Sequence, residues 1–415
     1  MRVLLSTYGS RGDVEPVVAL AAGLRALGAD AVVCAPADEE FIALAARAGV
    51  ELAPAFMPVR AWVTEALSNP GVDIRTRAAQ IVAAQFEAVS AAAEGCDLVV
   101  ATGLFPSTAA AKSVAEHRGL PYVYGAYCPM FVPSEHHRPF AYPGHPQPQG
   151  ADNRALWDFD IGVMNALFGE ATNRHRAAVG LPGVENVRDH VFTDRPWLAA
   201  DPVLSPWRPT DLRRVVHTGA WILPDDRPLP AELLTFLEAG SPPVYVGFGS
   251  MPMQAARDAA VAAIEAARAQ GRRVLLSRGW AELAPADGRD DVFLVGDTNQ
   301  QALFPRVAAV VHHGGAGTTT TAARAGAPQV VVPQIADQPY WASRVAAMGV
   351  GVAHGGPAPT SESLSAALAT TLATETAERA RAVAGTIRGD GATVAARMLR
   401  QMVGGEGFEP PTLSV

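Results

Sequence analysis

A regular alternation of short apolar runs with alanine-rich segments of helical spacing constrains the fold of this 415-residue chain more than any other feature. In the first half, the pattern predicts strands at 2–7, 31–34, 98–102 and 122–124, with helices at 14–27, 39–48, 75–93 and 107–118. In the second half, it predicts strands at 244–248, 273–276, 292–295, 308–312 and 329–332, with helices at 257–269, 300–304, 319–325, 338–348 and 361–373. Strands that alternate with helices at this spacing form parallel sheets covered by helices on both faces.

Nine or more strands are many for one twisted sheet, so we expect two sheets. The segment 202–223 has little periodicity and contains three prolines, Pro202, Pro206 and Pro209, which predicts a domain boundary near residue 210. The expected architecture is α/β, with two facing Rossmann-like domains and a deep cleft between them. We assign residues 1–205 to an N-terminal domain, 206–395 to a C-terminal domain with a terminal helix, and 396–415 to a helix end and flexible tail.

Composition and charge exclude several classes of partner. Hydrophobic residues make up 49% of the chain and the formal net charge is -8, so a large core is available and no basic footprint exists for nucleic acid or an anionic membrane. Cys34, Cys96 and Cys128 form no CxxC pair and are interpreted as small buried apolar residues. The first apolar run is too short for a secretory signal, and no run approaches the ~20 apolar residues of a membrane span. We therefore expect a cytoplasmic protein.

The first motif that contains candidate functional residues is TYGSRGD, which ends at Asp13 and separates the first predicted strand from its helix. A glycine turn between strand and helix at the start of an α/β domain brings residues to the carboxyl edge of the sheet, where ligands bind. Gly9 and Gly12 permit close approach of a ligand. Asp13 stands at the predicted helix start, where an ordinary N-cap is one interpretation. Its flanking Ser10, Arg11 and glycines favour a functional carboxylate as the other.

The second motif is HHGGAGTT, residues 312–319, between a hydrophobic strand and a helix. Backbone N–H groups and the dipole at a helix start favour a diphosphate, and His313, Thr318 and Thr319 add side-chain donors. The Gly-Lys-Ser/Thr ending of a P-loop is missing, which argues against an ATPase. A plain glycine-rich turn is the structural alternative.

The third motif is PQIADQP, residues 333–339, directly after the next predicted strand. The adjacent acid and amide of Asp337 and Gln338 can hold sugar hydroxyls by paired hydrogen bonds. Alternatively, Asp337 only caps the helix that follows.

Two more patches end strands that reach the same predicted edge, GFGS at 247–250 and SRGW at 277–280. Serines can bind phosphate or ribose, and the planes of Arg278 and Trp280 can support a nucleobase. Core packing is the structural alternative for Trp280.

Taken together, these segments resemble a known family. HHGGAGTT followed by PQIADQP resembles the donor-binding signature of the inverting, nucleotide-sugar-dependent glycosyltransferases with the GT-B fold. The opening GSRGDVEP is similar to the start of the glycopeptide-antibiotic glycosyltransferases of the vancomycin and teicoplanin type, and also to that of sterol glucosyltransferases. TDRPWLAADPVLSPWRPTDL, HTGAWILPDDRPLP and LSRGWAEL resemble the glycopeptide subgroup specifically, and the resemblance extends to about residue 395.

The resemblance implies roles for the matching positions. Asp13 would be the general base that takes the proton of the acceptor hydroxyl, at a place where many relatives have histidine. His313 and the small residues beside it would hold the diphosphate. The implied donor-binding residues are Ser10, Arg11, Gly12, Ser250, Ser277, Arg278, Trp280, Val295, His313, Gly314, Gly315, Ala316, Gly317, Thr318, Asp337 and Gln338. The family implies no metal and no cofactor beyond the nucleotide-sugar co-substrate.

The expected function is therefore inverting transfer of a sugar from UDP or dTDP to a hydroxyl of a glycopeptide aglycone or pseudoaglycone, by a monomer. Loops at 125–150 and 56–70 are candidate acceptor contacts, because loops over a rigid sheet commonly carry specificity. His136, His137 and His145 lie in the first loop without the partner ligands that a metal site needs. The alternatives are the same chemistry on a sterol, a lipid or another natural product, a nucleotide-sugar epimerase, and a non-catalytic sugar-nucleotide binder.

Overall fold

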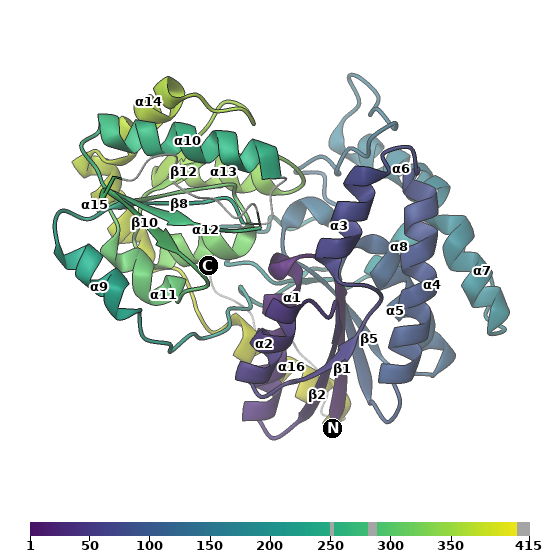
Figure 1. Ribbon diagram of the computed structural model, residues 1–415. Helices are drawn as coiled ribbons and strands as arrows, with labels where there is room; N and C mark the ends of the chain where they lie inside the picture. The colour runs from purple at the N-terminus through teal and green to yellow at the C-terminus, as the bar shows by residue number, and fades with distance from the viewer. Residues whose placement is uncertain (250–252, 281–288, 405–415) are drawn as a thin grey trace. The chain divides into compact units, whose positions relative to one another are not determined.

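The computed structural model of the chain describes residues 1–249, 253–280 and 289–404, and it divides into two compact units (Figure 1). The first unit comprises Met1–Ala200, Trp207–Leu223 and the chain from Gly389 onward. The second comprises Asp201–Pro206 and Pro224–Arg388.

The first unit is built on a parallel seven-stranded sheet with the order β3-β2-β1-β4-β5-β6-β7. Its strands are β1 (Arg2–Tyr8), β2 (Asp30–Ala35), β3 (Glu51–Pro54), β4 (Leu98–Gly103), β5 (Tyr122–Ala126), β6 (Trp197–Leu198) and β7 (Val216–His217). The central strands β1 and β4 are apolar and fully buried along most of their length, which is typical of a sheet with both faces covered.

Helices cover both faces of this sheet. On one face α1 (Arg11–Ala26) packs against α2 (Glu39–Arg47) and α16 (Gly391–Gly404), and on the other α4 (Ile74–Ala92) packs against α5 (Phe105–His117) and α7 (Glu170–Ala178) (Figure 1). The remaining helical segments are α3 (Val59–Ser68), η1 (Pro129–Phe131), α6 (Asn153–Met164), the π-helical η2 (Asn165–Gly169) and α8 (Val187–Phe192).

The second unit contains a parallel six-stranded sheet with the order β10-β9-β8-β11-β12-β13. Its strands are β8 (Val244–Gly247), β9 (Val274–Ser277), β10 (Val292–Val295), β11 (Ala309–His312), β12 (Gln329–Val331) and β13 (Gly351–Ala353). Its helices are α9 (Ala231–Glu238), α10 (Met253–Ala269), α11 (Gln300–Leu303), η3 (Phe304–Arg306), α12 (Ala316–Arg324), α13 (Gln338–Ala347), α14 (Ser361–Thr371) and α15 (Thr374–Ala384). One apolar core lies between the sheet and α10 and α14, and another between the sheet and α9, α11 and α12.

The predicted architecture of two parallel sheets flanked by helices is confirmed. All nine predicted strands are present, together with β3, β6, β7 and β13, which are two to four residues long. β6 and β7, with two residues each, carry too few residues for a recognisable apolar pattern.

The units differ from the predicted domain limits at three places, of which one is that Trp207–Leu223 belong with the first unit. Residues 201–206 belong with the second unit, because the buried carboxylate of Asp201 accepts hydrogen bonds from the backbone N–H groups of Leu204 (2.9 Å) and Arg388 (2.8 Å). Helix α16 belongs with the first unit, where it packs on α1. A Cβ on Gly391 would lie 2.4 Å from the carbonyl oxygen of Ala220, so only glycine allows this close backbone approach.

Within the described ranges, no helix is long and apolar enough to cross a membrane. The same ranges hold no group of three or more His, Cys, Asp or Glu side chains arranged to bind a metal ion.

Candidate active site

Asp13 lies at the carboxyl edge of the first unit's sheet, just beyond β1. The helix begins at Arg11, three residues earlier than predicted, and its N-cap is Ser10. Asp13 is therefore not the N-cap residue but the third residue of the helix, and its Oδ2 accepts a 2.8 Å hydrogen bond from the backbone N–H of Ser10. This contact belongs to a capping box, in which the side chain of Asp13 reaches back to the start of the helix.

The turn before α1 is shaped around that carboxylate. A Cβ atom on Gly9 would lie 2.0 Å from Oδ2 of Asp13 and 2.4 Å from its Cγ. No side chain fits there without displacing the carboxylate, so glycine at this position allows the Asp13 carboxylate to stand where it does.

Tyr127 and an ion pair of α1 lie near Asp13. Tyr127 Oη donates to the Asp13 carbonyl oxygen at 3.2 Å and lies 2.9 Å from Thr102 Oγ1. Burial, with a smaller contribution from the Asp13 charge, raises the pKa of Tyr127 well above its ordinary value, so the phenol stays protonated. The guanidinium of Arg11 forms a 2.7 Å ion pair with Glu15 one turn further on. The Tyr127 hydroxyl thus fixes the backbone carbonyl of Asp13.

In the second unit, five strands bring their carboxyl ends to one edge in register, with His312 paired to Gly247 and to Val331, and Val295 paired to Ser277. The loops that follow are hydrogen-bonded to one another. The Arg278 N–H donates to Val295 O at 3.1 Å, and the Trp280 N–H donates to Gly249 O at 3.0 Å. The segments predicted to hold the donor therefore lie at one edge of one sheet.

A helix start at the centre of this edge is suited to an anion. Helix α12 begins at Ala316 with Gly315 as its N-cap, so no capping side chain competes for the first N–H groups. Free N–H groups and the positive end of the helix dipole favour a phosphate at such a position. Gly314 has φ +97, a conformation that glycine adopts without strain, and this allows the chain to turn from β11 into the helix.

The two adjacent histidines have different positions and tasks. His312 is fully buried, with Nε2 2.9 Å from Gln329 Oε1 and Nδ1 accepting from the Gly314 N–H at 3.1 Å, so it fixes the shape of the loop. The ring of His313 lies at the glycine turns, since a Cβ on Gly249 or on Gly315 would come within 2.8 Å of it.

Burial lowers the pKa of both imidazoles, to about 3 for His312 and to about 4 for His313, where the Gly247 backbone partly opposes the effect. Both rings are neutral near pH 7. The sequence predicted His313 as a ligand-facing imidazole, and the structure places it beside the start of α12.

The PQIADQP segment packs directly against the glycine-rich loop at the start of α12, residues 313–315. A Cβ on Gly314 would lie 3.1 Å from Gln338 O. The Gln338 side-chain oxygen accepts from the Gln334 N–H at 2.8 Å, so its NH₂ is the group that it offers to a ligand. Asp337 Oδ2 accepts from Trp341 Nε1 at 2.8 Å rather than capping α13, and burial raises the pKa of this carboxyl. Both side chains are thus oriented by their own helix and loop.

The structure brings most of the predicted donor residues together in the second unit: Ser277, Arg278, Trp280, Val295, His313, Gly314, Gly315, Ala316, Gly317, Thr318, Asp337 and Gln338. Ser10, Arg11 and Gly12 lie in the first unit with Asp13. Ser250 lies outside the described residues. Sequence reasoning missed Gly249 and Gly279, whose positive φ values (57 and 52) and close backbone contact support the edge, although a glycine directly after a predicted strand is a usable signal.

Comparisons with known proteins show the family of the chain. Residues 286–395 match the family described as erythromycin biosynthesis protein CIII-like, C-terminal domain. Among relatives from Amycolatopsis orientalis, the chain is 55% identical to glycosyltransferase GtfE over 98% of both chains, and 54% identical to a vancomycin aglycone glucosyltransferase over 100% of both. It is 52% identical to a dTDP-epi-vancosaminyltransferase, covering 92% of this chain and 93% of that one.

The fold agrees as well. The solved structure of a glycotransferase of kitacinnamycin superposes with a TM-score of 0.69 at 20% identity, covering 96% of this chain and 98% of that one. Since identities above 50% extend over the whole length, the chain is a GT-B glycosyltransferase that belongs to the vancomycin-type glycopeptide-antibiotic glycosyltransferase family.

Proposed function

We propose that the enzyme transfers a sugar, with inversion, from a UDP- or dTDP-sugar to a hydroxyl of a glycopeptide aglycone or pseudoaglycone. The observation that carries the proposal is the start of α12, where uncapped N–H groups lie beside the neutral ring of His313 and against the PQIADQP segment. The name of one relative, a vancomycin aglycone glucosyltransferase, supports this acceptor class, and the name of another, a dTDP-epi-vancosaminyltransferase, supports a dTDP-sugar as donor.

In this proposal the second unit holds the donor. The diphosphate binds at the helix start, where Thr318 adds a hydroxyl. The nucleobase and ribose lie against Arg278, Trp280 and the backbone near Val295. Asp337 and Gln338 bind the donor sugar through a carboxylate and an amide, groups whose paired donors and acceptors match sugar hydroxyls.

The chemistry follows from where charge develops. The acceptor oxygen attacks the anomeric carbon as the diphosphate leaves, and negative charge accumulates on the leaving phosphate. Fixed N–H donors and a helix dipole aimed at that phosphate stabilise this charge without reorganising. We propose that they do so without a bound metal, while Asp13 takes the acceptor proton as a general base, a contribution that is typically about 10²–10⁴ in rate.

For the acceptor, the first unit offers aromatic surfaces that suit an aromatic, cross-linked peptide. Phe140 lies between Phe131 and Tyr142, with ring centroids 6.3 Å and 5.0 Å away, and the rings of all three are only partly buried. In the other candidate segment, the ring of Phe56 lies 5.6 Å from that of Tyr8 at the end of β1. Rings presented in this way can stack on or meet the edges of aromatic acceptor groups.

A cytoplasmic monomer completes the proposal. Cys34, Cys96 and Cys128, which are all described, are buried and form no disulfide, which suits a reducing compartment. Light scattering on the purified chain would measure its mass in solution.

The test is an assay of the purified enzyme with UDP-glucose, UDP-GlcNAc and dTDP-deoxysugars against heptapeptide aglycones, sterols and lipids, analysed by mass spectrometry. A glycosylated heptapeptide product supports the proposal. Transfer only to a sterol or lipid would overturn the acceptor class, and a changed donor sugar without any acceptor would indicate an epimerase.

A further inference from the structure

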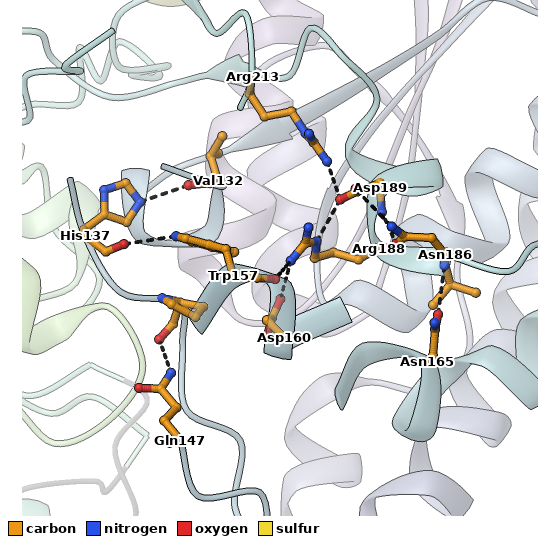
Figure 2. A network of polar contacts seen from close by, with 12 residues as sticks. Val132, His137, Gln147, Trp157, Asp160, Asn165, Asn186, Arg188, Asp189 and Arg213 are labelled. Carbon is orange, nitrogen blue, oxygen red and sulfur yellow. Dashed lines mark hydrogen bonds and ion pairs between the residues drawn. The ribbon is translucent and has the colours of Figure 1, made fainter. Parts of the chain in front are cut away.

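The loop from Cys128 to Gly150 contains almost no regular secondary structure, yet specific side chains hold it in place (Figure 2). Trp157 of α6 donates from Nε1 to the carbonyl oxygen of His137 at 3.0 Å. The His137 ring then donates from Nε2 to the carbonyl oxygen of Val132 at 2.9 Å, which closes the first half of the loop. One indole N–H thus connects a helix of the first unit to the loop.

A buried arginine, Arg188, holds Trp157 in place. Arg188 of α8 is only 3% exposed, donates from Nη1 to the Trp157 carbonyl oxygen, and lies 3.3 Å from Asp160 Oδ2 (Figure 2). Its guanidinium carbon is 5.5 Å from the centroid of the Trp157 ring, a cation–π distance. The same residue therefore holds both the backbone and the ring of Trp157.

The carboxylate of Asp189, in the first turn of α8, in turn orients Arg188. Its Nε donates to Asp189 Oδ1 at 2.8 Å, Asp189 pairs with Arg213, and Asn186 donates to Asp189 Oδ2 at 3.0 Å. Burial raises the pKa of the neighbouring Asp160 carboxyl to about 6 although Arg188 opposes the shift, which indicates how strongly this site is desolvated. Buried charge networks are expensive for stability, and their best-attested use is to specify one geometry.

We propose that Trp157 and Arg188 are positioning residues that hold the loop 128–150 in the geometry that binds the acceptor. The proposal rests on the proposed function above, in which this loop contacts the acceptor. It assigns to the Arg188–Trp157–His137 connection a role in acceptor affinity and none in donor binding, because the proposed donor residues other than Ser10, Arg11 and Gly12 belong to the second unit.

Trp157→Phe is the sharpest variant, since it removes the indole N–H and keeps an aromatic ring over Arg188. We expect the acceptor KM to rise about tenfold, with the Kd for UDP-glucose unchanged. Arg188→Lys, which keeps the charge but loses the planar fork, is expected to change the acceptor KM in the same direction.

Arg176→Lys is the matched control. Arg176 is another buried arginine of the first unit, but its hydrogen bonds go to Glu116 Oε2 (2.5 Å), His190 Nε2 (3.2 Å) and the Pro182 carbonyl oxygen (3.0 Å), none of which lies in the loop. Its loss is expected to lower thermal stability without raising the acceptor KM. If Arg176→Lys raised that KM as much as Trp157→Phe, general loosening of the unit would explain the effect and the proposal would be overturned.

Hydrogen exchange provides a readout without substrate. In Trp157→Phe, the N–H groups of Val132 and His145, which donate within the loop at 2.9 Å and 3.0 Å, are expected to exchange faster, and in Arg176→Lys they are not. Unchanged exchange in Trp157→Phe, or faster exchange with an unchanged acceptor KM, would overturn the proposal. If the wild-type enzyme glycosylated no heptapeptide at all, the proposed function would fail, whereas the exchange result would still show whether Trp157 holds the loop.

Discussion

The backbone N–H of Ser10 donates a 2.8 Å hydrogen bond to Oδ2 of Asp13. This one contact joins the start of α1 to the carboxylate that we propose as the catalytic base. It orients the side chain at the edge of the sheet, and the positive end of the α1 dipole stabilises its negative charge. Stability and catalysis therefore depend on the same carboxylate, and variants must be chosen to separate them.

Gly9→Ala is expected to inactivate the enzyme although Gly9 has no side chain to take part in chemistry. The new Cβ would lie 2.0 Å from Asp13 Oδ2, so the carboxylate must move. We expect the transfer rate to fall by about 10² or more, the range of a lost general base. Gly162→Ala on α6 is the control, because a Cβ there meets no described atom within 4 Å. A steady-state assay with saturating donor compares the two, and wild-type turnover in Gly9→Ala would contradict the assigned geometry.

In the second unit, Gly249→Ala is expected to weaken donor binding. Gly249 has φ +57, and its Cβ would lie 2.8 Å from Cε1 of His313. Displacement of the imidazole should raise the Kd for UDP-glucose about tenfold, which is ~1.4 kcal/mol. Gly385→Ala, at a position with helical φ and an unobstructed Cβ, is expected to bind like the wild type. Isothermal titration calorimetry measures both, and equal Kd values would show that the ring does not contribute.

Donor binding is expected to depend on pH through His313. Burial holds its pKa at about 4 in the unliganded enzyme, and a bound diphosphate raises that pKa because it favours the charged imidazolium. The complex then binds more protons than the free enzyme, so affinity increases as pH falls from about 8 to 6. UDP-glucose is the suitable ligand because each of its two phosphates carries one strongly acidic oxygen, so the charge of the diphosphate does not change over this pH range. The slope should vanish in His313→Gln, and an equal slope in both proteins would exclude His313 as its source.

The enzyme is expected to lose stability in mild acid. The pKa values of His190, His312 and His313 are lowered to about 4, 3 and 4, chiefly by burial, so each ring contributes stability above its unfolded pKa of about 6.5. That contribution is lost as the pH falls from about 6.5 through 4, because the unfolded chain binds the protons first. Asp160 acts in the opposite sense, since its raised pKa of about 6 favours the folded state at low pH.

His190→Gln isolates one of these imidazoles. It removes a titrating group from the unfolded state, so the variant should gain thermal stability relative to the wild type as the pH falls from 7 to 5. The matched control is His117→Gln, an exposed position on α5, which should follow the wild type at every pH. Melting curves recorded across this range test the assignment, and parallel curves for His190→Gln and the wild type would refute it.

The sequence predicted the elements that carry the site because apolar strands followed by glycine turns have a strong local signal. Asp337 and Gln338, for example, follow a buried strand, and in both the prediction and the structure Gln338 is the first residue of the next helix. The short strands β6 and β7 were not predictable, since two residues pair there only because distant segments return to the sheet. The start of α1 at Arg11, with Ser10 as its N-cap, was also missed, because the hydrophobic pattern of this helix begins only at Val14.

The proposed donor and acceptor contacts also differ in how well the sequence predicts them. The phosphate and sugar positions that we propose follow strand ends and could be inferred from the sequence. The Arg188–Trp157–His137 connection joins α8, α6 and a loop through contacts between residues 20 to 31 positions apart, and no local pattern marks it.

The central claim is that Asp13 is the general base of the transfer. Asp13→Asn tests it most directly, because the amide oxygen can still accept the Ser10 N–H and preserve the start of α1. Glu15→Gln, which removes the neighbouring carboxylate that pairs with Arg11, serves as its control. We predict that Asp13→Asn lowers the transfer rate by about 10²–10⁴ while the Kd for UDP-glucose stays within about twofold of the wild type. An Asp13→Asn enzyme that keeps more than roughly a tenth of the wild-type rate would contradict the account.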